Sequence, residues 1–206
     1  MNKYVISNSE GQFQENSNEL VMLNKLGITS LDEINTVEMV LLETLYLEIF
    51  ENQFPVNSRI NISMIKNWHR LWLGNVYDWA GKERTADISK GGFLFVSCSQ
   101  LQKLLNEFEK KFLAIYTPCT KMNEDLLIEA LSIIHVEFIL IHPFRDGNGR
   151  ISRLLADVMS VQGGKKPLDY QYWEQNKDEY ISAIHSGLSG NYYPMNYLIK
   201  KALKII

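Results

Sequence analysis

Apolar residues recur along most of this chain at the spacing of amphipathic helices. A first helix is predicted to begin after Ser30, whose side chain can cap the helix together with Glu33, and to run to about Phe50. A long segment that begins after Asn123 and ends at Ile141 is apolar on most sides, as a buried central helix is. Further helices are predicted over residues 60–73, 99–116 (begun by Ser99), 149–161, 170–186 and 193–204. The pattern therefore predicts an all-α fold.

Residues 82–97 interrupt the helical pattern. Two short segments, 85–88 and 93–96, alternate weakly between apolar and polar residues and flank the sequence Ser89-Lys90-Gly91-Gly92. Two strand-like segments around a pair of glycines predict a β-hairpin. Because a lone hairpin is only marginally stable, we expect it either to pack on the helices or to work as a mobile flap.

The first 17 residues are polar and show no periodicity, so we expect a loosely held N-terminal arm. Residues 18–206 are then expected to form one domain, because a chain of 206 residues can bury one sizeable core. No internal repeat or low-complexity block suggests a second unit.

Composition narrows the class of protein. Apolar residues make up 46% and charged residues 22% of the chain, as in ordinary globular proteins. The net charge of −3 gives no basic field, so we expect no direct binding of nucleic acid. No apolar run approaches the roughly 20 residues that span a bilayer, and no signal peptide is read at the N-terminus. Only two cysteines, Cys98 and Cys119, suggest a reducing compartment, so we expect a cytoplasmic protein.

The most informative stretch follows the central helix and runs from His142 to Arg150. Pro143 disfavours helical geometry at the residue before it, so the central helix should end at His142. An imidazole at the end of a rigid packed helix is well mounted to act as a base. Phe144 is expected to turn inward and anchor the loop.

The second half of this stretch has the residues of an anion site. Successive backbone amides of Gly147-Asn148-Gly149, followed by a helix N-terminus, can form a concavity that holds phosphates. Arg150 and Arg153 lie three residues apart, so both can reach one side of that helix. Asp146 borders the turn, and one carboxylate with substrate phosphate oxygens is a common arrangement around Mg²⁺. Each feature alone also fits a simple helix connector, but together they indicate nucleotide chemistry. No Walker A sequence is present to explain them otherwise.

The stretch resembles the signature of the Fic family, H-x-F-x-[DE]-G-N-G-R-x-x-R, at every fixed position from His142 to Arg153. Residues 77–84 are similar to the W-A-G segment of that family, and residues 88–93 resemble its flap hairpin. The likeness covers most of residues 20–200.

The resemblance implies a fold of about eight helices around a central buried helix, with an inserted β-hairpin flap. It also implies transfer of AMP from ATP to a Tyr, Ser or Thr hydroxyl of a target protein, with Mg²⁺ as cofactor. On this resemblance, His142 is expected to be the general base and Asp146 a ligand of Mg²⁺. The phosphates are expected to lie against Gly147, Asn148 and Gly149, with the outer phosphates bound by Arg150 and Arg153. The flap that binds the target protein is expected to contain Lys90, Gly91, Gly92 and Phe93.

Many Fic relatives carry an inhibitory motif, [ST]-x-x-x-E-[GN], whose glutamate pairs with the second signature arginine. The chain has no clean copy, because Thr29 and Glu33 have the spacing but Ile34 follows. We therefore hypothesise that Arg153 is not restrained by this chain and that a small separate antitoxin supplies the glutamate. Two other functions stay open: a Fic-fold transferase with another donor (phosphocholine, phosphate or another nucleotide), and a non-catalytic peptide-binding module. A homo-oligomer is also left open.

The other histidines are interpreted as structural. His135 and His142 would lie roughly 10 Å apart along one helix, too far apart to share a metal ion. We expect His135 to be a hydrogen-bonded core residue, and His69 to lie at the surface or to support the site.

Overall fold

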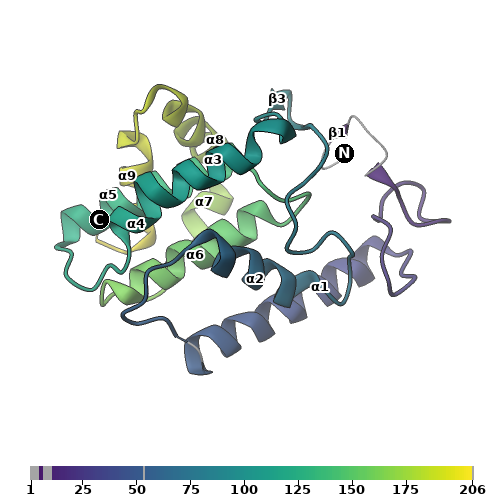
Figure 1. Cartoon of the computed structure of the whole chain (residues 1–206), viewed down its shortest axis with the longest axis horizontal. Coiled ribbons are helices and arrows are strands. Elements are labelled where there is room, and N and C mark those ends of the chain that lie inside the picture. The colour runs from purple at the N-terminus through teal and green to yellow at the C-terminus, as the bar shows by residue number, and fades with distance from the viewer. Residues whose placement is uncertain (1–4, 7–10, 53, 206) are drawn as a thin grey trace.

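In the computed structural model, the structure describes residues 5–6, 11–52 and 54–205. The predicted central helix is α5 (Glu124–Ile141), and the side chain of Asn123 caps it by accepting a hydrogen bond from the amide of Leu126. Most of its residues are buried, which confirms the interpretation of the apolar run. Helices from the rest of the chain pack around it, as Figure 1 shows: α6 (Asn148–Gln162), α9 (Tyr193–Ala202), α3 (Leu101–Phe108) and α8 (Lys177–Ser186).

The other helices complete the predicted all-α bundle. Helix α1 (Leu31–Leu47) packs against α2 (Ile62–Leu73), and α2 in turn contacts α6. The remaining helical segments are the π-helical turn Glu48–Asn52 after α1, the 3₁₀ turn Cys98–Gln100 before α3, the π-helical turn Glu109–Leu113 that joins α3 to α4 (Ala114–Tyr116), α7 (Gln171–Gln175) and the 3₁₀ turn Gly187–Ser189.

Two of the predicted helix boundaries are wrong. Ser99 does not cap a helix; instead the Asp87 carboxylate accepts hydrogen bonds from the amide of Cys98 at 2.7 Å and from the Ser97 hydroxyl at 3.1 Å. The Asp87 carboxylate, from the loop before the hairpin, thus accepts the hydrogen bond of a helix-start amide that a neighbouring serine would otherwise have accepted. The helix predicted over residues 170–186 is two helices, because Asn176 leaves helical geometry (φ −120°, ψ 54°) between α7 and α8.

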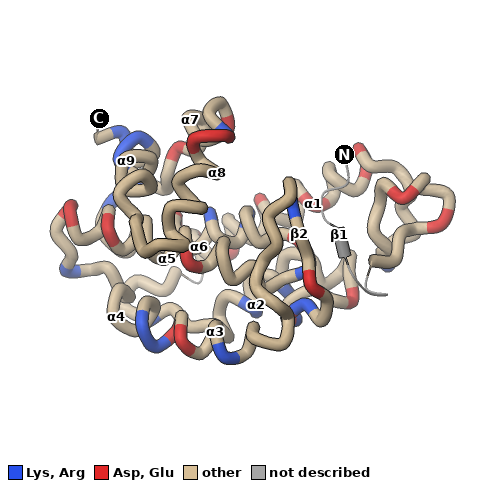
Figure 2. Tube along the Cα trace, turned by 90° about the horizontal axis from the view of Figure 1, so that it is seen from above, with Lys and Arg blue, Asp and Glu red and all other residues tan. Residues whose placement is uncertain are grey.

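The predicted hairpin is present and has an additional strand. Strand β2 (Ile88–Lys90) pairs antiparallel with β3 (Phe93–Leu94), and Gly91 and Gly92 make the turn at φ 59° and 82°. On its other edge β2 pairs with β1 (Val5–Ile6), a strand that periodicity does not reveal because only two residues pair. Figure 2 shows β1 and β2 side by side.

Part of the predicted N-terminal arm lies outside the described residues, and the boundary at residue 17 stays a prediction. In the described part, Phe13 forms a β-bridge with Met22, and the Ser17 hydroxyl donates to the carbonyl of Gln14 at 2.7 Å. The segment then contacts the loop after α2, where the amide of Lys25 donates to the carbonyl of Val76 at 2.8 Å. These contacts fix one wall of a groove that is described below.

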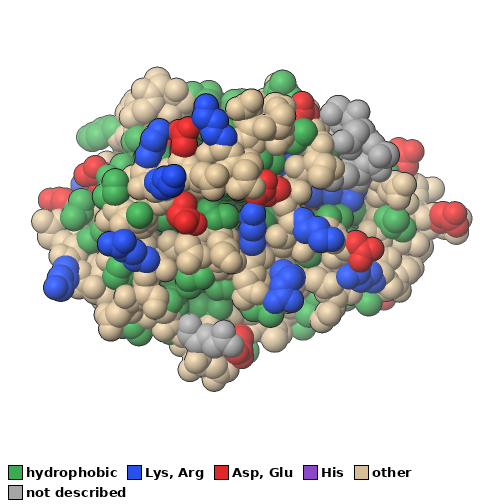
Figure 3. Space-filling model, viewed as in Figure 1, with side chains coloured by type: hydrophobic (Ala, Val, Ile, Leu, Met, Phe, Trp, Pro, Cys, Tyr) green, Lys and Arg blue, Asp and Glu red, His purple; other side chains and the backbone are tan. Residues whose placement is uncertain are grey.

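Within the described residues, no helix combines the length and apolar character needed to cross a bilayer. On the face shown in Figure 3, basic side chains stand apart from one another, with acidic side chains among them.

Candidate active site

His142 ends the central helix, as the sequence predicts. Its backbone adopts the left-handed conformation (φ 51°, ψ 59°), and its amide donates to the carbonyl of Phe138 at 3.0 Å. A left-handed residue other than glycine costs roughly 1–2 kcal/mol, and such strain is found where surrounding structure holds a functional residue in place.

The ring of His142 is fixed in one tautomer. Its Nδ1 lies 3.0 Å from the carbonyl oxygen of Ile139, and because a carbonyl can only accept, Nδ1 must donate and Nε2 carries the lone pair. The ring stacks on Phe95 with centroids 3.7 Å apart, and the residue is 4% exposed. Burial is the main reason that the pKa of His142 is lowered to about 3, and the positive charges of Lys90 and Arg84 act in the same direction. This pKa is well below the value near neutrality that suits a general base, and the ring is neutral at physiological pH, with the Nε2 lone pair unprotonated.

Arg84 holds the loop that carries His142. Its Nε donates to the carbonyl of His142 at 2.8 Å, its Nη1 to Ala86 at 2.7 Å, and its Nη2 to Val96. Its own amide donates to the carbonyl of Pro143 at 2.9 Å. One buried guanidinium thus joins the base to both ends of the hairpin. The sequence placed Arg84 in a family-like segment but gave no signal for this role, because its acceptors are backbone carbonyls of distant residues.

The turn after His142 is held together by its own side chains. Asn148 is fully buried, and its amide group both accepts from the Phe144 N–H at 2.8 Å and donates to the Phe144 carbonyl at 2.7 Å. The Asn148 side chain therefore closes the turn, and only its backbone can contribute to a phosphate cradle. Gly147 has φ 79°, and a Cβ there would lie 2.6 Å from the Trp72 ring. Gly149, by contrast, is exposed and faces open space.

His69 of α2 supports the turn from behind. Its Nδ1 accepts from the amide of Gly81 at 2.8 Å, so its Nε2 must be the donor to the carbonyl of Asp146 at 3.0 Å. Its ring stacks on Phe144 with centroids 4.0 Å apart. Burial lowers the pKa of His69 to about 4, so the neutral tautomer persists. Of the two positions expected for His69, the supporting one is confirmed.

Asp146 and Arg150 lie on the same side of the turn. The Asp146 Oδ1 accepts from the amide of Gly147 at 2.6 Å, and its Oδ2 lies 3.9 Å from Nη2 of Arg150. Among the described residues no three His, Cys, Asp or Glu side chains cluster as a metal site. A single carboxylate is nevertheless what Mg²⁺ commonly takes from a protein when phosphates supply other ligands.

Sequence reasoning missed Glu38 of α1. This buried carboxylate accepts from Arg150 Nη1 and from the Tyr77 hydroxyl, both at 2.7 Å. The Arg150 guanidinium also lies over the Trp72 ring, 4.4 Å from its centroid. Arg150 is therefore anchored between α1 and α2 rather than extended into solvent. An isolated glutamate in an amphipathic helix carries no sequence signal for such a contact.

Arg153 has a partner within this chain, while the hypothesis that a separate antitoxin supplies the inhibitory glutamate stays a prediction. Nη1 of Arg153 donates to Glu174 Oε1 of α7 at 2.9 Å, and its guanidinium lies 4.9 Å from the Tyr170 ring centroid. Glu174 belongs to no copy of the inhibitory motif. Because the Glu174 side chain is 60% exposed, the pair is worth at most about 1 kcal/mol. Phosphate groups can therefore compete for Arg153.

The structure brings the hairpin to the base through a row of aromatic rings. Phe93 packs edge-on against Phe95 with centroids 5.2 Å apart, and Phe95 stacks on His142. On its other side Phe93 stacks on His185 of α8 at 4.6 Å. Lys90 is exposed at the hairpin turn. The segment interpreted as a flap thus lies directly beside the residue interpreted as the base.

These elements match a known family. Residues 59–160 match the model of the Fic/DOC family, and solved Fic domains have the same fold. The chain belongs to the Fic/DOC family.

Three similar proteins illustrate the relationship. The protein adenylyltransferase VbhT of Bartonella schoenbuchensis is 27% identical over 89% of this chain and 37% of its own length. The protein adenylyltransferase fic-1 of Caenorhabditis elegans is 29% identical over 70% of this chain and 27% of its own length. The crystal structure of the BepC protein of Bartonella tribocorum with bound AMPPNP superposes with a TM-score of 0.71 at 19% identity, covering 88% of this chain and 91% of the chain in that crystal structure. The match thus spans only 37% of the length of VbhT and 27% of that of fic-1.

Proposed function

We propose that this protein transfers AMP from ATP to a Tyr, Ser or Thr hydroxyl of a target protein. The hydroxyl oxygen attacks the α-phosphorus, the bond from that phosphorus to the bridging oxygen breaks, and pyrophosphate leaves. Nε2 of His142 takes the hydroxyl proton. The observation that carries the proposal is the fixed tautomer of His142, whose Nδ1 donates to Ile139 so that the lone pair lies on Nε2. A base with its proton already placed on the other nitrogen needs no rearrangement before reaction.

The phosphate side of the reaction is assigned to the turn after His142. Backbone amides of Asn148 and Gly149 would face phosphate oxygens, whereas the amide of Gly147 donates to the Asp146 carboxylate. The open space above Gly149 allows the backbone a close approach to a ligand. Arg153 would bind an outer phosphate after release from Glu174. Positive groups in place before the reaction stabilise the charge that develops on the leaving phosphates.

Asp146 is the residue that would hold Mg²⁺. Its carboxylate is buried and oriented by the amide of Gly147, and this donor set fits a cation that takes most of its ligands from phosphate and water. When bound, Mg²⁺ would neutralise charge on the phosphates. Arg150, held on Glu38, keeps a positive charge on the same side of the turn.

Similar proteins support both the reaction and the nucleotide. VbhT and fic-1 are named protein adenylyltransferases, and crystal structures show the BepC protein with bound AMPPNP and a Fic domain from Bartonella quintana with bound ADP. We place the protein in the cytoplasm, with a target protein as one partner and a small antitoxin that supplies the inhibitory glutamate as another. The two unpaired cysteines support the reducing compartment.

Labelled ATP tests the proposal. Label from the α-phosphate on a protein acceptor means AMP transfer, label from the γ-phosphate means kinase action, and no label favours another donor or a binding module. His142→Ala should abolish transfer while ATP binding changes little, since His142 lies outside the phosphate cradle. Comparable turnover in this variant would contradict the assigned role of the base.

A further inference from the structure

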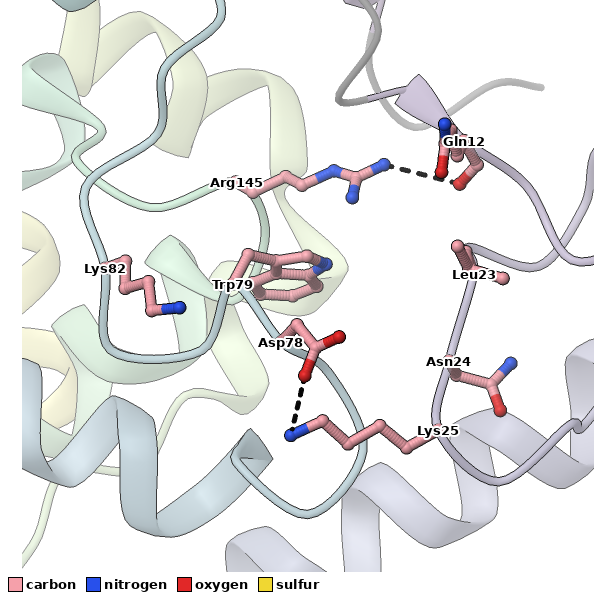
Figure 4. A pocket seen from close by; sticks show the side chains of 8 residues that line it. All are labelled: Gln12, Leu23, Asn24, Lys25, Asp78, Trp79, Lys82 and Arg145. Carbon is pink, nitrogen blue, oxygen red and sulfur yellow. Dashed lines mark hydrogen bonds and ion pairs between the residues drawn. The ribbon is translucent and has the colours of Figure 1, made fainter.

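A groove lies on the side of the catalytic turn that faces the N-terminal segment. Its larger part has a volume of about 560 Å³ and is lined by Gln12, Leu23, Lys25, Trp79, Lys82 and Arg145, among others (Figure 4). Three distant parts of the chain meet there: residues 12–25, the loop before the hairpin, and the signature turn. None of these lining residues has a role in the reaction proposed above.

The walls of this groove are fixed by hydrogen bonds. Asn24 accepts from the amides of Leu26 and Ile28 at 3.2 and 3.0 Å, and donates to the carbonyl of Ile28 at 2.8 Å. The Lys25 Nζ donates to the carbonyl of Gly74 at 2.8 Å. A cavity with walls held in this way needs little ordering when a ligand binds.

An indole donor points into the groove without an acceptor. The Trp79 Nε1 is buried and has no hydrogen-bond partner in the described part of the chain, and Figure 4 shows it aimed across the groove toward Leu23. The ring itself is fixed by stacking on Tyr77, with centroids 4.5 Å apart. Because a buried donor left unsatisfied costs about 1–3 kcal/mol, a ligand that brings an acceptor to this nitrogen is favoured.

The charge of the groove favours an anion. Lys25, Lys82 and Arg145 line it, and among the described lining residues one is acidic, Asp78, which is paired with Lys25 at 3.0 Å. The Arg145 guanidinium lies 5.7 Å from the centroid of the Trp79 ring, so a positive charge and the indole are presented together. Lys82 is exposed and has no ion-pair partner among the described residues.

The shape of the groove favours a chain over a small anion. A second hollow of about 370 Å³ shares Lys25, Asp78 and Lys82 with the first and adds Arg70 of α2. The two hollows together form an elongated basic surface, longer than one phosphate or carboxylate needs. We propose that this groove binds an acidic, extended segment of a protein, with carboxylates at the basic residues and an acceptor at Trp79 Nε1. The proposal goes beyond AMP transfer, because binding here requires no nucleotide.

Binding of a fluorescein-labelled hexaglutamate peptide to the whole chain tests this, by fluorescence anisotropy with excess MgATP present. We expect binding that a hexalysine peptide does not show and that MgATP does not displace. Lys82→Glu should weaken binding about tenfold, since it turns an attraction into a repulsion. Trp79→Phe keeps the ring and removes the N–H, and should weaken binding about fivefold. Lys121→Glu, in the exposed loop before α5, makes the same charge change elsewhere and should leave binding within about twofold.

Several results would overturn the proposal. Equal loss in Lys82→Glu and Lys121→Glu would mean that only overall charge matters. Displacement by MgATP would place the peptide on the phosphate turn. Tighter binding of hexauridylate than of hexaglutamate, with the same sensitivity to Lys82→Glu, would make the groove a nucleic-acid site. Circular dichroism of each variant separates these outcomes from loss of folding.

Discussion

The two glycines of the signature turn give the sharpest test, because the structure assigns them different reasons for being glycine. In Gly147→Ala the new Cβ would lie 2.6 Å from the Trp72 ring and 3.2 Å from Nε2 of His69, at a φ of 79°. Left-handed alanine costs about 1–2 kcal/mol. Overpacking against a buried ring costs about 1–3 kcal/mol more. We expect a loss of about 2–5 kcal/mol in the free energy of unfolding, or roughly 4–20 °C in Tm for a domain of this size.

Gly149→Ala is the matched control. Its Cβ would meet no atom within 4 Å, and its φ lies outside the left-handed region. Stability should change by less than about 1 kcal/mol, in the direction of a gain, because alanine favours the helix. ATP affinity should nevertheless fall, because the methyl group enters the space assigned to phosphates. Urea unfolding followed by circular dichroism and calorimetric titration of ATP measure the two effects. If Gly147→Ala were as stable as Gly149→Ala, the close contact with Trp72 would be refuted.

Three further outcomes are expected. Arg84→Lys should lower kcat about tenfold or more with ATP affinity nearly unchanged, since a compact ammonium lacks the span with which three guanidinium nitrogens reach three separate carbonyls; a pure rise in KM would contradict this. Glu174→Gln should tighten ATP binding by up to about fivefold, and unchanged affinity would mean the pair with Arg153 does not compete. Stability should fall below pH 6.5, because the lowered pKa values of His69 (about 4), His135 and His142 (each about 3) mean that the unfolded chain binds more protons. Each of these sites contributes about 1.4 kcal/mol per pH unit, and Asp157, whose pKa burial raises to about 6, offsets one of them below pH 6; urea titration at pH 7 and 5 measures the net loss.

His135 shows which properties of a residue could be predicted from the sequence pattern and which could not. The sequence predicts a hydrogen-bonded core residue, and the structure confirms it, with Nδ1 2.8 Å from the Ser152 hydroxyl and Nε2 2.8 Å from the Tyr180 hydroxyl. The burial of His135 could be predicted because the helix around it is apolar. Its hydrogen-bond partners could not be predicted, because Ser152 and Tyr180 come from other helices.

The wrong helix start at Ser99 and the missed strand β1 have the same origin. Ser99 is a reasonable cap by sequence, but Asp87, from the other side of the hairpin, reaches the amide of Cys98. Strand β1 pairs through only two residues, too few to show alternation. In both cases a long-range contact decided what local propensity left open.

The sequence by itself determined the helical class, the central helix, the hairpin and the chemically constrained turn from His142 to Arg153. It did so because periodicity, capping residues and glycines act over a few neighbouring residues. The tertiary structure alone decided the tautomer and the lowered pKa of His142, the hold of Arg84 on its carbonyl, and the pairing of Arg150 with Glu38 and of Arg153 with Glu174. Desolvation and long-range hydrogen bonds depend on which distant segments fold together, and no local pattern encodes that.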